Sequence, residues 1–362
     1  MKTSHMDLRD RRATFAALAE ETFDLLVIGG GITGAGIARD AAMRGLSVCL
    51  VEAQDFAAGT SSRSSKMVHG GMRYLLQGDV TVVREAARER RTLRKIAPHL
   101  ATTLPMVIMA RGKASMAKFR TGMWTYEKLG KVVAAEKHEA LGIDELRQRE
   151  PHLVTKGFYG AVTYPEYLTD DARLTLANIR SAVAAGAVVA SYAAATEILL
   201  ENGTACGAVV KGQLAGESLA ATVRARTIIN AAGPWVDAIR QLEDSAAPLK
   251  LQLTKGIHIV FKRDRLPVNN SVVMTTPDKR MIFTCPREDC VYVGTTDTFY
   301  PDSDYWPAIE AEDIDYLINT TNQCFDVEPL SREDIVSAWS GIRPLLGEEG
   351  KSPSEISRKD EI

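Results

Sequence analysis

The hydrophobic and polar positions near the N-terminus form blocks that predict a strand, a helix and a second strand. Phe23–Ile28 is a short apolar run, which is typical of a buried parallel strand. Ile32–Arg44 carries small apolar residues on one side and charged residues on the other, and Gly45 follows as a helix-ending signal. Ser47–Glu52 is again apolar up to its last residue. The pattern therefore predicts a β-α-β unit of about 30 residues with two parallel strands.

The next part of the chain predicts two further helices. Val82–Ile96 is amphipathic, its many arginines are expected on the solvated face, and Pro98 ends it. Thr169–Gly186 opens with a Thr-Asp-Asp cap and ends at glycine. Between about residues 100 and 165 the pattern is irregular and contains many aromatic residues, which suits an inserted lobe with a boundary near Tyr164.

Strand patterns dominate the second half of the chain. Asn202-Gly203 predicts a hairpin turn, and a buried strand at Arg226–Ala232 leads into Gly233. Three or four strands are expected between residues 251 and 298, and a polar helix is expected at Glu310–Cys324. The earlier strands of this half are expected at Val188–Tyr192, Thr196–Leu200, Gly207–Lys211 and Ala221–Ala225.

The composition excludes several classes of protein. The chain has 362 residues, of which 45% are hydrophobic and 25% charged, as in ordinary globular proteins of about two domains. Its formal charge of -2 provides no global field that would hold a nucleic acid. The five cysteines form no Cys-x-x-Cys pair and no zinc pattern, so we expect reduced thiols and no metal site.

The sequence also bears on the location of the protein. The N-terminal residues are charged throughout, which argues against a cleaved secretory signal. The most membrane-like stretch, Ser181–Thr196, is interrupted by Gly186 and shorter than the ~20 residues that a spanning helix needs. We therefore expect a cytoplasmic protein, and peripheral contact with the cytoplasmic membrane stays open.

A glycine motif follows the first predicted strand. Gly29, Gly31 and Gly34 have the spacing Gly-x-Gly-x-x-Gly, and Glu52 ends the next strand. The first glycine permits a tight turn, the second lets the backbone approach a pyrophosphate, and the third allows the helix to pack closely on the strand. Glu52 would accept a hydrogen bond from a ribose hydroxyl. The arrangement predicts a dinucleotide site, and the spacing alone does not separate FAD from NAD.

Longer motifs resemble a known family. The run from Gly29 to Leu75 contains Thr60-Ser61-Ser62, Ser64-Ser65-Lys66 and His69-Gly70-Gly71-x-Arg73-Tyr74. With these motifs the sequence resembles the FAD-dependent glycerol-3-phosphate dehydrogenases over nearly the whole chain, from about residue 23 to 360. Further matches are Asp170-Asp171-Ala172-Arg173, Asn230-Ala231-Ala232-Gly233-Pro234-Trp235, Lys255-Gly256-x-His258, Val293-Gly294-Thr295-Thr296-Asp297 and Ser340-Gly341-x-Arg343-Pro344.

The resemblance implies a function and a fold. The function is oxidation of sn-glycerol 3-phosphate at C2 to dihydroxyacetone phosphate, with hydride transfer to N5 of FAD and electrons passed to a membrane quinone. The fold is α/β, with a discontinuous, Rossmann-like, doubly wound FAD-binding domain and an inserted mixed β-sheet substrate domain, as in glycine oxidase. We expect the FAD-binding domain at 23–100, 165–250 and 335–362, the substrate domain at 101–164 and 251–334, and a leader at 1–22. The resemblance leaves open whether the protein forms a homodimer.

The resemblance also assigns roles to individual residues. His258 is the expected general base or hydrogen-bond partner of the C2 oxygen, because an imidazole titrates near working pH. Tyr74 would orient the substrate, and with His258 and Arg343 it forms the expected catalytic set. Arg73, Arg343 and Arg358 would bind the phosphate or the developing alkoxide, since a guanidinium can hold phosphate through two hydrogen bonds. Besides the glycine motif and Glu52, the expected FAD contacts are Thr60, Ser61, Ser62, Lys66, His69, Gly70, Gly71 and Gly233.

Two alternatives stay open. Family members continue after the position of Arg358 into a segment that closes over the flavin and then a C-terminal helical domain, which we expect this chain to lack. A site without one wall would admit water and lose fixed hydrogen bonds. The alternatives are a glycerol-3-phosphate oxidase that uses oxygen, and a truncated nucleotide-binding chain without catalysis.

Overall fold

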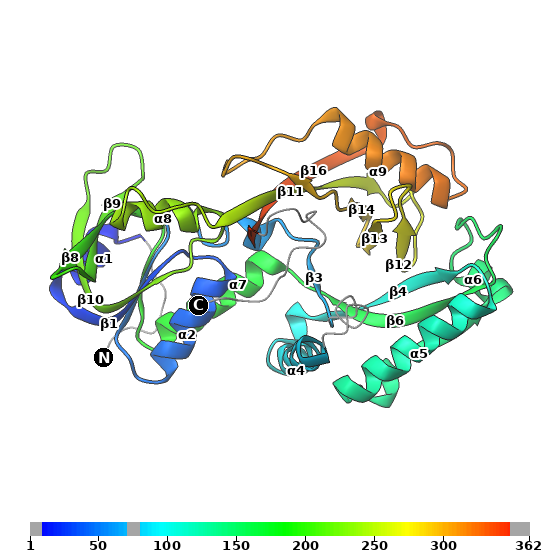
Figure 1. Cartoon of the computed structure of the whole chain (residues 1–362), viewed down its shortest axis with the longest axis horizontal. Helices are drawn as coiled ribbons and strands as arrows, with labels where there is room; N and C mark the ends of the chain where they lie inside the picture. The colour runs from blue at the N-terminus through cyan, green and yellow to red at the C-terminus, as the bar shows by residue number, and fades with distance from the viewer. Residues whose placement is uncertain (1–8, 71–79, 348–362) are drawn as a thin grey trace.

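Two β-sheets form the framework of the protein, and the computed structural model describes it over residues 9–70 and 80–347. The first sheet has the order β7 (Val188–Ala190), β2 (Val48–Val51), β1 (Thr22–Ile28), β10 (Ala220–Asn230), β9 (Thr204–Gly212) and β8 (Ala193–Glu201). The second has the order β15 (Thr298–Phe299), β11 (Leu251–Lys262), β14 (Cys290–Gly294), β13 (Met281–Arg287), β12 (Ser271–Thr275), β4 (Thr102–Ala110), β6 (Gly160–Leu168) and β3 (Met67–Val68). In addition, β16 (Ile335–Leu346) pairs with β11, and β5 (Glu139–Gly142) pairs with β6. The two sheets lie toward opposite ends of an elongated molecule (Figure 1).

The first sheet is covered on both faces. Its four strands β7, β2, β1 and β10 run parallel, and the β8–β9 hairpin adds two antiparallel strands at one edge. Helices α2 (Ile32–Met43) and α7 (Asp171–Ala184) share one apolar cluster with the sheet, which contains Val27. Helices α1 (Arg11–Glu20) and α8 (Val236–Glu243) share the opposite cluster, which contains Leu26. Apolar side chains on both faces are what a doubly wound sheet requires.

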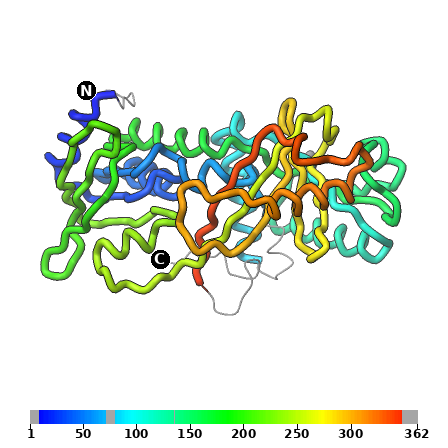
Figure 2. The backbone as a smooth tube through the Cα atoms, turned by 90° about the horizontal axis from the view of Figure 1, so that it is seen from above, coloured from blue at the N-terminus to red at the C-terminus, as the bar shows by residue number. Residues whose placement is uncertain are grey.

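The second sheet carries its own core. Helix α9 (Ala311–Cys324) and α6 (Ile143–Arg149) pack with β11, β14 and β12 around a buried cluster that includes Ile257 and Phe261. Helices α4 (Val80–Ile96) and α5 (Lys113–Gly130) form a smaller cluster around Tyr126. Viewed from above, the N-terminal strands lie at one end of the molecule and the yellow segment of β12 and β13 near the other (Figure 2). None of the helices within residues 9–70 and 80–347 combines the length and the hydrophobicity that a membrane-spanning helix needs.

Several local predictions are confirmed. The first β-α-β unit forms as β1, α2 and β2, with both strand pairs parallel. Asn202 and Gly203 turn between β8 and β9 with φ values of +51° and +76°, the left-handed conformation that such a two-residue hairpin needs. The predicted helix after residue 169 is α7, which Asp170 caps by accepting a hydrogen bond from the Arg173 N–H.

Other expectations were wrong in detail. The expected leader contains α1, whose Phe15 and Leu18 are buried in the core of the first sheet. The two strands expected at 221–232 are one long strand, β10, and β6 runs unbroken through the boundary expected at Tyr164. Residues 335–346 do not join the first sheet, because β16 pairs with β11 along almost its whole length. Apolar periodicity predicted strands at 221–232, but it predicted neither β6 nor β16, and it could not say which sheet a strand would join.

Candidate active site

The carboxyl ends of three parallel strands bring the predicted dinucleotide residues to one edge of the first sheet. Gly29 follows β1, Glu52 follows β2, and Gly233 follows β10 as the first residue of the short helix η4 (Gly233–Trp235). Gly29 has a φ of +115°, and a side chain there would collide with the carbonyl of Ala231. Ligands of open α/β sheets bind at this kind of edge.

The turn into α2 excludes a side chain at Gly34 and leaves little room for one at Gly31. A Cβ at Gly34 would collide with the Gly29 carbonyl oxygen, so helix and turn pack as the sequence motif predicts. Gly31 begins the helix without a side-chain cap, and its Cβ would approach the Ser61 hydroxyl to 3.1 Å. That hydroxyl accepts a 2.9 Å hydrogen bond from the N–H of Ile32. The Ser61 hydroxyl therefore lies at the first N–H of α2, where its own O–H can donate to an anion bound at the helix start.

Glu52 is fixed by the backbone around it. One carboxylate oxygen accepts from the Gly30 N–H at 2.6 Å, and the other accepts from the Gln54 N–H at 2.8 Å. Burial raises the pKa of this carboxyl above its ordinary value. A carboxylate has about four lone-pair sites, so ribose hydroxyls can still donate to it. The glycine turn and Glu52 together fit the adenosine and pyrophosphate parts of a dinucleotide.

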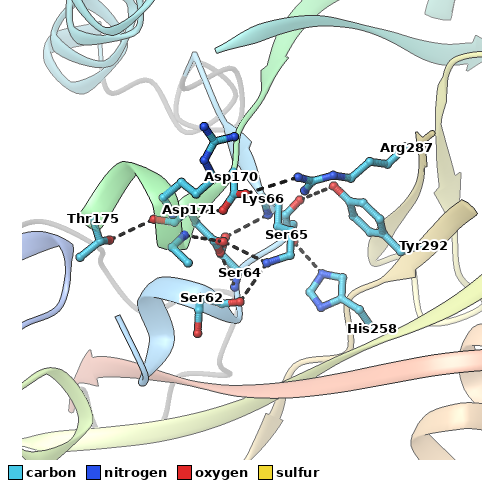
Figure 3. A network of polar contacts seen from close by, with 12 residues as sticks. Ser62, Ser64, Ser65, Lys66, Asp170, Asp171, Thr175, His258, Arg287 and Tyr292 are labelled. Carbon is cyan, nitrogen blue, oxygen red and sulfur yellow. Dashed lines mark hydrogen bonds and ion pairs between the residues drawn. The ribbon is translucent and has the colours of Figure 1, made fainter. Parts of the chain in front are cut away.

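The loop from residue 59 to 70 joins the two sheets. It begins with the short helix η1 (Thr60–Ser62), and the Thr60 hydroxyl donates to the carbonyl of Ile342 on β16 at 2.6 Å. The Ser62 hydroxyl donates only within the loop, to the carbonyl of Gly59 at 3.4 Å. Lys66 donates from Nζ to Asp171 at 2.9 Å and to the Ser62 carbonyl at 2.9 Å (Figure 3).

The end of this loop rests on a buried ion pair that sequence reasoning missed. The Gly70 N–H donates to Glu166 Oε2 on β6 at 3.0 Å, and Nη1 of Arg90 on α4 donates to the same oxygen at 3.2 Å. Arg90 is 2% exposed, so the expectation that the arginines of this helix are all solvated was wrong. The preceding residue of the loop, His69, lies edge-on to Phe283 with ring centroids 6.1 Å apart. The only signal in the sequence was a glutamate inside an apolar strand.

His258 on β11 lies in a buried aromatic environment. Its side chain is 2% exposed, its ring stacks on Trp339 with centroids 4.6 Å apart, and Nε2 shares a 2.9 Å hydrogen bond with the Ser65 hydroxyl. Nδ1 has no hydrogen-bond partner among the described residues. Burial, followed by the charges of Arg343 and Lys66, lowers the pKa of the imidazole to about 3. Because a general base works best with a pKa near working pH, this environment favours a neutral hydrogen-bonding role.

Arg343 on β16 lies opposite Thr254 of β11, close enough to His258 for its charge to act on the imidazole. Its Nη1 donates to Asp297 at 2.9 Å and its Nη2 to the Thr295 hydroxyl at 3.1 Å. A side chain at Gly256 would collide with the guanidinium, and one at Gly294 would collide with the His258 ring. The two glycines therefore leave the space in which both groups lie.

The structure thus brings most of the predicted residues into two adjacent groups. The dinucleotide group lies at the edge of the first sheet, and the group of Lys66, His258 and Arg343 lies where the loop meets β11 and β16. Gly71, Arg73, Tyr74 and Arg358 lie outside the described residues. Within residues 9–70 and 80–347, no cluster of three or more His, Cys, Asp or Glu side chains could hold a metal ion.

Comparison with models of protein families decides the class of the molecule. Residues 24–355 match the family described as FAD dependent oxidoreductase. The chain belongs to this family. Membership confirms FAD as the cofactor of the dinucleotide site, which the glycine spacing had left open, and it confirms the class of enzyme as an oxidoreductase.

Curated relatives confirm the resemblance seen in the motifs. The chain is 45% identical over 356 residues to the aerobic glycerol-3-phosphate dehydrogenase of Bacillus subtilis (strain 168), a match that covers 98% of this chain and 63% of that protein. It is 45% identical over 349 residues to the protein of the same name from Staphylococcus saprophyticus, covering 95% of this chain and 62% of that one. The chain therefore spans less than two thirds of the length of these relatives.

Solved structures confirm the fold class. The glycerol-3-phosphate dehydrogenase from Bacillus halodurans, complexed with FAD, superimposes with a TM-score of 0.79 and 37% identity, covering 94% of this chain and 61% of that one. The glycine oxidase from Bacillus cereus has a TM-score of 0.67 at 20% identity, covering 90% and 84%. The second likeness concerns the fold alone, and it agrees with the predicted pairing of an FAD-binding domain with a mixed-sheet domain.

Proposed function

We propose that this FAD-dependent oxidoreductase oxidises sn-glycerol 3-phosphate to dihydroxyacetone phosphate. The relatives at 45% identity carry the name of that activity. The observation in the structure that carries the proposal is that His258 and Arg343 flank the end of β14: the His258 ring packs against Gly294, and Arg343 donates to the Thr295 hydroxyl. An imidazole beside a guanidinium suits a substrate that has a secondary hydroxyl close to a phosphate.

The chain's own residues would bind and orient the substrate. FAD, when bound, supplies the acceptor for the hydride that leaves C2. His258, neutral because of its low pKa, would face the C2 oxygen with a ring that the Ser65 hydroxyl holds at Nε2. Arg343 would place the phosphate or stabilise the developing charge, and Asp297 keeps its fork in one orientation. Arg73, Arg358 and Tyr74 would complete this set.

We further propose a quinone as the electron acceptor, reached through peripheral contact of a cytoplasmic protein with the membrane. The names of the relatives support a dehydrogenase over an oxidase. A homodimer is compatible with this arrangement. The acceptor is decided by what reoxidises the reduced flavoprotein, because an oxidase forms one hydrogen peroxide for each substrate oxidised.

An anaerobic reduction tests the proposal. The purified flavoprotein is mixed with sn-glycerol 3-phosphate without oxygen, and the visible flavin absorbance is followed. We expect bleaching within the time of one turnover, rapid recovery of colour with a soluble quinone and slow recovery with air. Stoichiometric peroxide on exposure to air would make the protein an oxidase, and bound FAD that never bleaches would contradict both enzymes.

Two arginine variants localise the substrate in the same assay. Arg343→Ala should raise the KM for glycerol 3-phosphate at least tenfold, the equivalent of about 1.4 kcal/mol or more, because a charged hydrogen bond is lost. Arg332→Ala is the control, since Arg332 is an exposed residue that pairs with Asp315. An equal change of the KM for glycerol and for glycerol 3-phosphate in the Arg343 variant would exclude a phosphate role.

A further inference from the structure

The strongest unassigned feature of the site is a network of polar contacts between the 62–66 segment and the N-terminus of α7 (Figure 3). Its centre is Asp171, the first residue of α7, which is not among the residues expected to touch substrate or FAD. Lys66, Ser64 and Ser65 all belong to the loop that the sequence assigns to the flavin. The network therefore holds loop residues of the candidate site through a residue that is not itself part of that site.

Asp171 receives hydrogen bonds from two side chains of the loop. Its Oδ1 accepts from Lys66 Nζ at 2.9 Å, and its Oδ2 accepts from the Ser64 hydroxyl at 2.7 Å. Lys66 and Asp171 are 21% and 11% exposed, so the pair is shielded from water. Lys66 also has a φ of +53°, an uncommon conformation for a residue with a side chain. The Asp171 carboxylate thus anchors the segment at Lys66, where the backbone adopts this uncommon conformation.

Ser65, the residue between these two contacts, links the loop to the candidate catalytic histidine. Its carbonyl accepts a 2.8 Å hydrogen bond from the Tyr292 hydroxyl on β14, and its own hydroxyl shares the 2.9 Å bond with His258 Nε2. The position of this hydroxyl depends on the backbone at 64–66. That backbone is anchored through Ser64 and Lys66 to Asp171 on one side and through Tyr292 on the other.

We propose that Asp171 is a positioning residue, which holds the 64–66 segment so that the Ser65 hydroxyl fixes the orientation and tautomer of His258. The inference rests on the proposed function for its catalytic consequence, but the positioning itself is a property of the protein without substrate. The Ser65 hydroxyl can donate to Nε2 or accept from it, so its position influences both the orientation of the ring and which nitrogen carries the proton. Asp171 therefore acts on the substrate only through Ser65 and His258.

Asp170 provides a matched control. It precedes Asp171 directly, caps the same helix through the N–H of Arg173, and makes only a 3.8 Å contact with Arg287. Within residues 9–70 and 80–347 its side chain makes no hydrogen bond or ion pair with the loop, so Asp170→Asn removes one negative charge at the same helix end without releasing Lys66. Asparagine also caps helices well, which preserves α7 in that variant.

The first measurement is the nuclear magnetic resonance signal of the His258 ring in the purified flavoprotein without substrate. The chain has six histidines, and the signal of His258 is identified by its loss in His258→Asn. Wild-type protein should show a single neutral tautomer at neutral pH. Asp171→Asn should shift this signal toward that of Ser65→Ala, whereas Asp170→Asn should leave it in place. An unshifted signal in Asp171→Asn, or an equal shift in both aspartate variants, would overturn the proposal.

Kinetics provide the second measurement. A small displacement of positioned groups can lower turnover by about 10²-fold, so Asp171→Asn should lower kcat about 10- to 100-fold and change KM by less than about threefold. The double variant Asp171→Asn/Ser65→Ala should be no slower than Ser65→Ala, because both changes break one path. Additive losses would show that Asp171 acts elsewhere. If Asp171→Asn fails to fold, Ser64→Ala takes its place, because it removes one of the two side-chain hydrogen bonds to Asp171. We expect Ser64→Ala to change kcat and the His258 signal in the same direction but by less.

Failure of this proposal is distinguishable from failure of the proposed function. The His258 signal needs no turnover, so it reports on Asp171 even if glycerol 3-phosphate is not the substrate. If the flavoprotein bleaches with glycerol 3-phosphate and the His258 signal is the same in wild type and in Asp171→Asn, only the positioning role is excluded.

Discussion

The glycine turn after β1 and the loop around Ser65 serve the same candidate site, yet different interactions hold them. Gly29 and Gly34 form a turn whose partners are backbone atoms, and even Glu52 binds through backbone N–H groups. Ser65 instead depends on side chains from α7 and β14, and Gly70 depends on Glu166 and Arg90. Backbone-made structure leaves a local pattern in the sequence, whereas structure made by side chains depends on residues that are distant in the chain.

This comparison predicts the largest energetic effect at the buried ion pair. Glu166→Ala should lower the free energy of unfolding by about 3–5 kcal/mol, because Arg90 would stay buried with only the more distant Glu136 carboxylate, at 3.6 Å, to compensate its charge. Urea unfolding checks this value. The matched control is Glu139→Ala, which breaks a pair with Arg149 whose side chains are 59% and 47% exposed, and it should cost less than about 1 kcal/mol. Similar losses in both variants would contradict the difference between buried and exposed pairs.

The second prediction concerns the backbone-made turn. Gly34→Ala should lower the free energy of unfolding by about 1–3 kcal/mol and weaken FAD retention, because its methyl group would collide with the Gly29 carbonyl. Gly36→Ala on the same helix is the control, since a Cβ there meets no atom within 4 Å. Alanine should stabilise that position by about 0.5–1 kcal/mol through its helix propensity. Unfolding curves and flavin content after desalting measure both effects, and equal behaviour would contradict the packing role of Gly34.

The last prediction concerns the protonation of His258, whose effect is measured over the limited range from about pH 7 to about pH 5. The pKa of this ring is about 3 in the folded protein and ordinarily 6.5, so between these values the unfolded chain binds a proton that the folded protein does not. The contribution of His258 to stability is therefore complete above about pH 6.5 and is lost as the pH falls toward 3, by up to about 1.4 kcal/mol per pH unit. Between about pH 7 and pH 5, the free energy of unfolding should fall more in the wild-type protein than in His258→Asn. Parallel curves would show that the ring titrates normally.

The same comparison explains how far the sequence could predict the structure. The first β-α-β unit, the Asn202-Gly203 hairpin and the glycine motif follow from local chemistry, since turns and caps need particular residues at adjacent positions. Family motifs added Lys66, His258 and Arg343, whose contacts no periodicity predicts.

The missed features depend on contacts between distant residues. Glu166 meets the Gly70 N–H across 96 residues, and Lys66 meets Asp171 across 105. Helix α1 was missed for the same reason, because its apolar side chains are buried only by contact with the first sheet. The pattern of an arginine-rich helix predicts solvated side chains, and it carries no sign of the buried Glu166 on β6 that pairs with Arg90.

The contact of Thr60 with Ile342 has a consequence for biosynthesis. The two residues are 282 positions apart, so a ribosome must add all the intervening residues before the loop can be fastened to β16. At about 5–20 residues per second this takes roughly 15 to 60 s. During that interval the apolar β1 also waits for its parallel partner β10, which is made much later. The nascent chain therefore presents an unfinished dinucleotide site to chaperones and proteases until β16, the last strand of the second sheet along the described chain, has been made.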